Sequence, residues 1–585
     1  MVARLSTDIL VVGGGTGGVA AAIQAARRGI DTILVSEFAW LGGMLTTAGV
    51  SAPDGNELAA FQTGLWGAYL QALRGREKEG LDNAWVSLFT YDPRTGADIF
   101  ADWVRQLPNL HWISGQIPLE VMRQGDRIIQ VRFADYIIEA KIIIDGTELG
   151  DLLALADMPY RWGWELQSEF NEPSAPTTFN KLTQRYPVQS PTWVFLLQDY
   201  ENSSSPPIPS LPSLPVSHSS FKDAWTNHGA EKFLNYGRLP GDLFMINWPI
   251  CGNDYGEDLG RLIASETSRR EFLQEAYNHS QNFAYFIQQE LGQRYNLAQS
   301  IFPHFQTSFA FHPYYRESRR IKGKVTITER DILSNNGGCV AALPITENNE
   351  VSSIAIANYA NDHHYPGVDF PLQAKSIRWG GRWTGTPFTI PYGALISNSV
   401  DNLLVCEKNI SVSHIANGST RLQPVVMNIG QAAGMAAALC IESNCQPKEI
   451  SIRSLQEALI TDSLAPSAII PLFNLVPEHP DWLYWQRYYL DHPENYPLDG
   501  NCSCKEIDFE VENCNLYQGI FHFHDYQDYR ITLTEPINQA SQTWQLITTH
   551  PQVNLQLQNC LDGQLVSILG RCNFSGRWLS VEKFA

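Results

Sequence analysis

The sequence predicts an α/β protein with a doubly wound parallel sheet, an inserted α+β region and a small β-rich module toward the C-terminal end. Three observations favour this class. A strand, a glycine-rich turn, a helix and a second strand open the chain. A helix rich in alanine and glycine returns near residue 430, and strand-like runs dominate residues 505–585. Alternating strands and helices are typical of a parallel sheet covered on both faces.

The opening segment predicts a Rossmann-type dinucleotide-binding unit. Residues 8–12 are an apolar, β-branched run, residues 19–28 have a helical pattern, and residues 32–35 form a second strand-like run. The G-x-G-x-x-G spacing between the first two permits a tight turn, close approach of a pyrophosphate and close helix packing. The pyrophosphate then lies at the positive end of the helix dipole. The predicted contacts are Gly13, Gly15, Thr16, Gly17 and Gly18.

An acidic residue and a small-residue loop follow this unit. Glu37 ends the second strand about 20 residues after the glycines, where a carboxylate accepts hydrogen bonds from ribose hydroxyls. Residues 40–50 are rich in small and hydroxyl-bearing side chains, so their backbone is able to lie along an extended cofactor. The predicted contacts from this loop are Gly42, Gly43 and Met44.

Further strands are expected between residues 110 and 150. Short strand-like runs and a Gly125-Asp126 turn predict a β-meander there. Residues 140–144 are a buried strand, and ligands of doubly wound sheets bind at the carboxyl ends of strands. The predicted contacts at this strand end are Asp145, Gly146 and Thr147.

The glycines of the returning helix indicate a flavin. Gly430 and Gly434 lie four residues apart in a predicted helix over residues 424–441, so they share one face. Each costs about 1 kcal/mol relative to alanine, which indicates a very close neighbour, either a second helix or a flavin ring. The helix dipole would favour the negative charge that a flavin gains on reduction. The two glycine signals together predict FAD, with Gly430, Gln431 and Gly434 beside it.

Composition divides the chain. From about residue 156 aromatic side chains become dense and the patterning less regular, which favours an inserted, substrate-facing region. The predicted FAD-binding domain comprises residues 1–155 and 385–450, and the substrate-facing domain residues 156–384. Residues 451–504 are expected to be a helical and loop connector, and residues 505–585 a β-rich accessory module.

Several stretches carry a family resemblance: residues 13–18 with Glu37, 41–44, 144–152, 315–323, 390–395 and 402–434. With them the chain resembles the broad family of FAD-dependent oxidoreductases that shares the glutathione-reductase-type FAD domain and is distantly related to fumarate reductases. The resemblance covers residues 5 to about 445 and implies an FAD-binding domain, without specifying a reaction. Cys406-Glu407-Lys408 departs from the Ala-Gly-Arg usual in the family.

Two residues of the return segment are the first catalytic candidates. Flavin dehydrogenases need a base near the C–H bond that breaks, and reductases need an acid. His414 precedes Arg421 on the segment expected to face the ring, although a core-packed histidine is the equal alternative. Arg421 would bind a substrate carboxylate or the flavin C2 carbonyl, or else form a salt bridge at a helix end.

Two further clusters are weaker candidates. His363 and His364 belong to a polar run, and one of them is expected to reach the substrate pocket. Adjacent side chains point in different directions, so we do not interpret them as a metal pair. Arg316 and Arg320 would hold an anionic substrate or, as we favour, form an internal salt-bridge lattice.

Composition excludes other classes of function. The net charge of −20 argues against a nucleic-acid partner, which requires clustered Lys and Arg. We find no 18-residue apolar stretch and no signal peptide, so we expect no transmembrane segment and a cytoplasmic location. The ten cysteines include no C-x-x-C and no common zinc spacing, so no metal is predicted.

The leading hypothesis is an FAD-dependent oxidoreductase that transfers a hydride between FAD and a small organic substrate. The sequence has no second G-x-G-x-x-G unit, so electrons would pass to or from a separate partner rather than a built-in NAD(P)H domain. The alternatives are an NADPH-fed monooxygenase or reductase, and a flavin enzyme without net redox. A further alternative is a non-catalytic FAD-binding protein whose C-terminal module binds a partner or a glycan.

Overall fold

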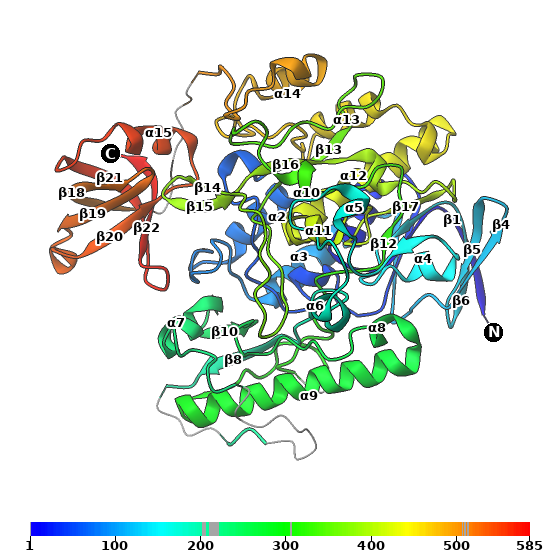
Figure 1. Cartoon of the computed structure of the whole chain (residues 1–585), viewed down its shortest axis with the longest axis horizontal. Helices are drawn as coiled ribbons and strands as arrows, with labels where there is room; N and C mark the ends of the chain where they lie inside the picture. Colours follow the sequence, from blue (N-terminus) through cyan, green and yellow to red (C-terminus); the bar gives the residue numbers. More distant parts are fainter. Residues whose placement is uncertain are drawn as a thin grey trace.

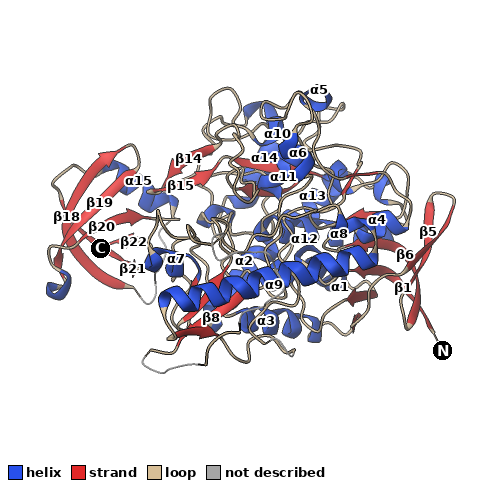
Figure 2. Cartoon of the chain, turned by 60° about the horizontal axis from the view of Figure 1, so that its bottom comes forward, coloured by secondary structure: helices blue, strands red, loops and turns tan. Residues whose placement is uncertain are grey.

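The computed structural model describes residues 2–201, 206–209, 221–304, 307–505, 507, 511 and 514–585. An α/β body occupies the centre of the molecule (Figure 1). The long helix α9 (Glu266–Leu291) runs along one side of it, and a barrel that contains the C-terminus lies at one end. Figure 2 shows the same three parts coloured by secondary structure.

The central sheet has the strand order β3-β2-β1-β6-β5-β4, with β17 added beside β6. Strands β1, β2, β3, β6 and β17 are parallel, and the β4–β5 hairpin continues the sheet in antiparallel fashion. The bounds are β1 (Ala3–Val12), β2 (Thr32–Ser36), β3 (Leu110–Ser114), β4 (Glu120–Gln124), β5 (Arg127–Arg132), β6 (Tyr136–Asp145) and β17 (Leu403–Val405).

The predicted meander is correct for β4, β5 and β6 and wrong for β3. Residues Leu110–Ser114 pair in parallel with β2, in the register Thr32–Leu110 to Ser36–Ser114, so β3 belongs to the doubly wound part of the sheet. Helix α3 (Pro93–Arg105) precedes β3 and supplies the crossover that a parallel strand requires. A short strand alone carries no signal that separates a hairpin from a crossover.

Helices α1 (Thr16–Arg27) and α12 (Gln423–Ser443) pack with their backbones in direct contact. A Cβ placed on Gly430 would lie 2.2 Å from the carbonyl oxygen of Gly17, and one on Gly434 would lie 2.2 Å from that of Ala21. The close neighbour of the two glycines is therefore a second helix. Helix α12 is long and apolar enough to span a membrane, but 89% of its most apolar window is buried inside the protein.

The inserted region is built on an antiparallel sheet of order β11-β8-β10-β9. Its strands are β8 (Phe195–Asp199), β9 (Arg238–Leu239), β10 (Leu243–Ile246) and β11 (Tyr295–Leu297). Helix α9 packs on this sheet through Phe283 and Ile287, which share a buried cluster with Phe195 and Trp248. The dense aromatics of the sequence thus form the core of this region.

Short pairs of strands link the parts: β7 (Tyr160–Arg161) with β12 (Arg320–Ile321), β13 (Ser353–Asn358) with β16 (Pro387–Pro391), and β14 (Ser376–Trp379) with β15 (Arg382–Gly385). The remaining α-helices described are α2 (Gly64–Arg76), α4 (Asp151–Leu155), α5 (Gln167–Phe170), α6 (Lys181–Arg185), α7 (Ala230–Leu234), α8 (Arg261–Ala264), α10 (Glu329–Ile332), α11 (His414–Thr420), α13 (Ile452–Ile460), α14 (Trp482–Asp491) and α15 (Pro551–Asn559).

The C-terminal β-rich module is a closed barrel of order β18-β19-β20-β22-β21. Its strands are β18 (Asn515–Asp525), β19 (Asp528–Glu535), β20 (Thr543–Ile547), β21 (Leu565–Asn573) and β22 (Trp578–Phe584). The barrel docks on the β14–β15 turn, where the backbone N–H of Thr548 donates to Gly380 O (2.8 Å) and Gln545 Nε2 donates to Gly381 O (2.7 Å). Trp578 Nε1 also donates to Asp82 (2.9 Å), so the barrel is packed against the body.

Candidate functional site

The predicted dinucleotide loop lies where the carboxyl ends of β1 and β6 meet the start of α1. Gly13 has φ +110°, and a Cβ there would lie 2.1 Å from Gly146 O. A Cβ on Gly18 would lie 2.1 Å from Gly13 O. Because both contacts are with backbone atoms, only glycine fits at these two positions, and the turn stays open to a ligand that approaches the main chain.

An anion occupies the N-terminus of α1. The helix has no side-chain cap, and the backbone N–H of Gly17 donates to Glu407 Oε1 at 2.6 Å. Lys408 Nζ lies 2.5 Å from Glu148 Oε2 and 3.3 Å from Glu407 Oε2. Burial raises the pKa of Glu407 to about 7 against the lowering effect of Lys408. The amide is thus aimed at a negative charge, as a phosphate-binding helix end requires.

The other predicted contact residues of the loops surround this helix end. Thr16 Oγ1 donates to Gly42 O (2.8 Å), and a Cβ on Gly43 would lie 2.8 Å from the backbone N of Thr16. Met44 is fully buried beside them, and Glu37 is exposed at the end of β2. The structure therefore brings the 13–18 turn and the 42–44 loop together.

The carboxyl end of β6 lies against the same turn. Asp145 Oδ1 accepts hydrogen bonds from the backbone N–H (2.9 Å) and the hydroxyl (2.7 Å) of Thr147, while Asp145 Oδ2 is buried without a partner. Burial raises the pKa of Asp145 to about 7, and the two bonds from Thr147 oppose it. Gly146 approaches Gly18 so closely that a Cβ would lie 2.6 Å from its Cα.

Three predicted contact residues lie elsewhere. Gly430 and Gly434 face α1, as described above. Gln431 Oε1 accepts from the backbone N–H of Leu65 (2.8 Å), and its Nε2 donates to Ala465 O (2.8 Å). All three residues pack α12 into the body. Backbone atoms of α1 lie against the two glycines, and backbone groups of the protein bond both polar atoms of Gln431.

A cavity of about 380 Å³ opens at the N-terminal end of α12. The 50–54 loop, the end of β10, residues 314–316, the segment 359–364 and residues 421–423 line it. Its polar side chains include Asp54, Tyr314, Arg316, Asp362, Arg421 and Gln423.

A chain of alternating charges runs along the wall of this cavity. Arg316 Nη1 lies 3.1 Å from Asp254 Oδ1, and His364 Nδ1 lies 3.0 Å from Asp254 Oδ2. The other ring nitrogen of His364 lies 2.9 Å from Asp362 Oδ2, which also contacts Arg421 Nη2 at 2.9 Å. Although burial raises the pKa of Asp362, His364 and Arg421 outweigh it and hold the pKa far below its usual value.

Several polar atoms of the cavity residues have no partner. Gln423 Oε1, Arg421 Nε and Arg316 Nε are buried and unpaired, as are both amide atoms of Asn361. Buried polar atoms in proteins are almost always hydrogen-bonded, and a polar ligand in the cavity would supply partners for these exceptions. The loop residue Asp54 also faces the cavity, and burial, reinforced by Glu57, raises its pKa well above the usual value despite Arg382.

His414 and His363 are not among the residues that line this cavity. His414 is fully buried, with Nδ1 2.9 Å from Glu317 Oε1 and Nε2 2.6 Å from the Tyr365 hydroxyl. The same hydroxyl lies 2.7 Å from His363 Nδ1, and His363 Nε2 lies 3.0 Å from Ile415 O. Burial lowers the pKa of each histidine to about 3, so both are neutral at pH 7.

These distances fix the direction of the hydrogen bonds. His363 must donate to the Ile415 carbonyl, so its other nitrogen accepts from the Tyr365 hydroxyl. Tyr365 therefore accepts from His414, whose Nδ1 then accepts from a protonated Glu317. Burial, opposed by Arg320, raises the pKa of Glu317 to about 7, which agrees with this assignment. His414 and His363 thus orient the segment that carries His364.

A family model for FAD-dependent oxidoreductases matches residues 8–459, more than half of the chain. The chain belongs to the FAD-dependent oxidoreductases. This confirms the predicted family, the α/β class and FAD as the cofactor of this enzyme. A comparison with curated proteins found no match.

Solved structures resemble this FAD-dependent oxidoreductase weakly. GidA from Aquifex aeolicus is 17% identical over 24% of this chain and about a quarter (25%) of its own, with a TM-score of 0.17. A geranylgeranyl bacteriochlorophyll reductase-like protein from Thermoplasma acidophilum is 10% identical over 78% and 84% of the two chains (TM-score 0.33). The p-nitrophenol 4-monooxygenase PnpA from Pseudomonas putida is 12% identical over 48% and 62% (TM-score 0.24). Likeness at this level says nothing about the reaction.

The residues at the α1 end fit FAD. The nearest atoms to a Cβ on Gly13 would be backbone atoms, whereas a Cβ on Gly15 would lie 2.4 Å from Glu407 Oε1, so the helix end already holds an anion, the Glu407 carboxylate. A pyrophosphate would take that position if the Glu407 carboxylate turned away or were protonated. The residues that would hold it are Gly15, Thr16 and Gly17, with Glu37 available to the ribose.

Sequence reasoning missed much of the cavity. Asp54 is followed by a glycine, and an Asp-Gly pair is typical of an ordinary turn. Asp254 and Gln423 lie in no recognisable sequence motif. The sequence gives Arg316 and Arg320 the same interpretation, but the fold places them in different surroundings. Arg320 is fully buried against Glu165 (2.9 Å) in the expected lattice, whereas Arg316 borders the cavity.

Proposed function

We propose that this FAD-dependent oxidoreductase transfers a hydride between FAD and a small polar organic molecule held in the 380 Å³ cavity. The observation that carries the proposal is that Arg316, Arg421 and Gln423, each with an unpaired buried polar atom, line a cavity of ligand size. We further propose that electrons pass to or from a separate partner, because the sequence contains a single G-x-G-x-x-G unit.

FAD, when bound, supplies the two-electron chemistry. The chain supplies orientation and a proton path. Arg421 is held by the Tyr314 hydroxyl (2.6 Å) and by Asp362, which leaves its Nε free to bind a substrate oxygen. Asp54 is the proposed acid or base, because it lines the cavity and burial raises its pKa well above the usual carboxyl value. His364 fixes Asp362 and thereby Arg421, so it is a positioning residue.

The same proposal divides the chain into domains. We assign residues 1–155 and 385–450 to FAD binding and residues 156–384 to the substrate side. Support comes from the cavity wall, to which residues 236–249 and 314–364 contribute from the second group and residues 50–54 and 421–423 from the first.

Anaerobic stopped-flow spectroscopy tests the proposal. The FAD-loaded protein is mixed with NADH, with NADPH, and with panels of small hydroxy acids, amino acids and sugars. We expect slow bleaching of the flavin by both nicotinamides and fast bleaching by one organic class. Asp54→Asn should slow that bleaching at least tenfold, while Asp31→Asn, an exposed aspartate remote from the cavity, should not.

Two results would redirect the proposal. Fast bleaching by NADPH would favour the monooxygenase or reductase alternative. Turnover of an organic compound without any electron acceptor would favour a flavin enzyme that catalyses no net redox reaction.

A further inference from the structure

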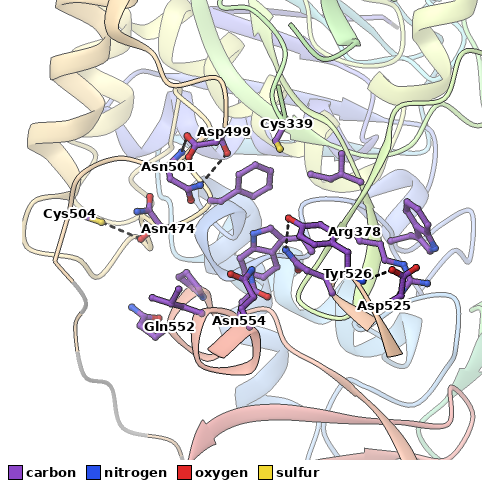
Figure 3. Close-up of a pocket in the computed structure, with 18 of the residues that line it drawn as sticks. Cys339, Arg378, Asn474, Asp499, Asn501, Cys504, Asp525, Tyr526, Gln552 and Asn554 are labelled. Carbon is purple, nitrogen blue, oxygen red and sulfur yellow. Dashed lines mark hydrogen bonds between the residues drawn. The ribbon is translucent and has the colours of Figure 1, made fainter. Parts of the chain in front are cut away.

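A second cavity, of about 840 Å³, lies between the barrel and the body, and we call it the junction cavity. Four segments and Cys339 line it: the β14–β15 hairpin, residues 473–505, the β18–β19 turn and helix α15 (Figure 3). It shares no lining residue with the cavity at α12. Its volume falls within the range of about 300–1,000 Å³ that is typical of ligand sites, which often form at domain boundaries.

Two large aromatic rings at this cavity are exposed to solvent. Trp383, from β15, is 61% exposed, and Tyr526, from the β18–β19 turn, is 68% exposed. The guanidinium carbon of Arg378 lies over the Trp383 ring, 5.1 Å from the ring centroid. Behind them Trp379 stacks on Phe473 at 6.1 Å. Exposed aromatic rings that gather at one cavity are typical of a binding surface.

The polar lining consists mainly of amides. Asn554 in α15 is only 5% exposed, yet its Oδ1 has no hydrogen-bond partner. Gln552 Oε1, two residues earlier in the same helix, is also buried and unpaired. Figure 3 shows both side chains among the residues that line the cavity. An unpaired buried amide carries a desolvation cost of about 1–3 kcal/mol that a ligand hydroxyl would remove.

The charges around the cavity balance. Asp499 and Asp525 face Arg378 and Lys505, and Arg378 is already paired with Asp528 at 3.1 Å. A phosphate or polyanion would need an excess of free cations here. Amides donate and accept at once, so they match hydroxyl groups, which do the same. The ring faces match the C–H faces of a saturated ring.

We propose that the junction cavity binds an uncharged oligosaccharide, whose sugar rings lie on Trp383 and Tyr526 and whose hydroxyls bond Asn554 and Gln552. The barrel then serves to recognise a saccharide, while the flavin chemistry takes place at α12. The proposal does not depend on the proposed reaction.

Isothermal titration calorimetry of the FAD-loaded full chain tests it. The probes are three neutral hexasaccharides, cellohexaose, maltohexaose and chitohexaose, with hexagalacturonate as the charged comparison. We expect heat of binding with at least one neutral probe and none with hexagalacturonate. Trp383→Ala and Tyr526→Ala should each weaken that binding at least tenfold, and Asn554→Leu at least fivefold.

The control variant is Phe574→Ala, because Phe574 is 65% exposed on the same barrel but lies outside the cavity. Its affinity for the probe and the flavin spectrum of all variants should match those of the unaltered protein. Binding of none of the neutral probes, binding of hexagalacturonate alone, or unaltered affinity in both Trp383→Ala and Tyr526→Ala would overturn the proposal. Both aromatic residues are exposed, so these variants are expected to fold.

Discussion

Replacing Gly430 by alanine should separate two helices that the FAD-binding fold holds in contact. The added Cβ would lie 2.2 Å from Gly17 O, 2.7 Å from Gly17 Cα and 2.8 Å from Gly17 C. All three are main-chain atoms of α1, so no side chain is able to move aside. An acceptable contact of 3.0 Å or more requires α12 to shift by about 0.8 Å at this point.

The size of the effect follows from two opposing terms. Alanine gains about 1 kcal/mol over glycine in a helix interior. Overpacking in a rigid core costs about 1–3 kcal/mol, and here the neighbour is backbone, so we expect the upper end of that range. The net loss of about 1–2 kcal/mol should lower the unfolding midpoint of the FAD domain by about 2–8 °C. The shift also moves Gly17, so FAD affinity should fall.

Gly75→Ala is the matched control. Gly75 lies in the last turn of α2, has a helical φ, and a Cβ there would meet nothing within 4 Å. The same substitution should therefore leave the midpoint unchanged or raise it slightly. Differential scanning calorimetry and flavin fluorescence measure both quantities. An unchanged or raised midpoint for Gly430→Ala, with full FAD affinity, would refute the reasoning.

Three further results are expected. FAD should bind the apoprotein more tightly at pH 6 than at pH 8, because protonation of Glu407 near pH 7 removes a competing negative charge. In fluorescence titrations, Glu407→Gln should abolish this difference in affinity. A pH-independent affinity in the unaltered chain would contradict the prediction. Substrate oxidation should rise with pH through the raised pKa of Asp54, because the base is the ionised form, and Asp54→Asn should lose that limb of the rate profile. His414 should stay neutral at pH 5 in ¹⁵N NMR spectra, because burial lowers its pKa to about 3. In the unfolded chain the same imidazole takes up a proton below about pH 6.5. The contribution of His414 to folding stability is therefore lost as the pH falls from about 6.5 toward 3.

The parts of the fold that short segments encode could be predicted from sequence. The strand at residues 8–12, the spacing of Gly13, Gly15 and Gly18, and the position of Glu37 all depend on neighbours within about 30 residues. The close approach at Gly430 was predicted as well, but its partner was not determined. A glycine in a helix indicates that some atom lies very close to the backbone, but it does not indicate which atom.

The cavity could not be predicted in the same way. Its charge chain joins Asp254, Arg316, Asp362 and Arg421, which come from separate segments of the inserted region and the return segment. Arg421 and Arg316 are candidates from the sequence, but no single segment indicates that these four charges meet at one cavity. His414 was favoured over His364 because it lies nearer Arg421 in sequence. The fold turns His414 into the core and His364 toward the cavity.

A crystal structure of the FAD-loaded protein would test the central claim most directly, because the claim is that the flavin ring and the 380 Å³ cavity adjoin at the start of α12. The account predicts that the isoalloxazine ring borders this cavity, with the unpaired groups of Arg421 and Gln423 and the carboxyl group of Asp54 on the substrate side of the ring. A ring held away from the cavity, with protein side chains between them, would contradict it.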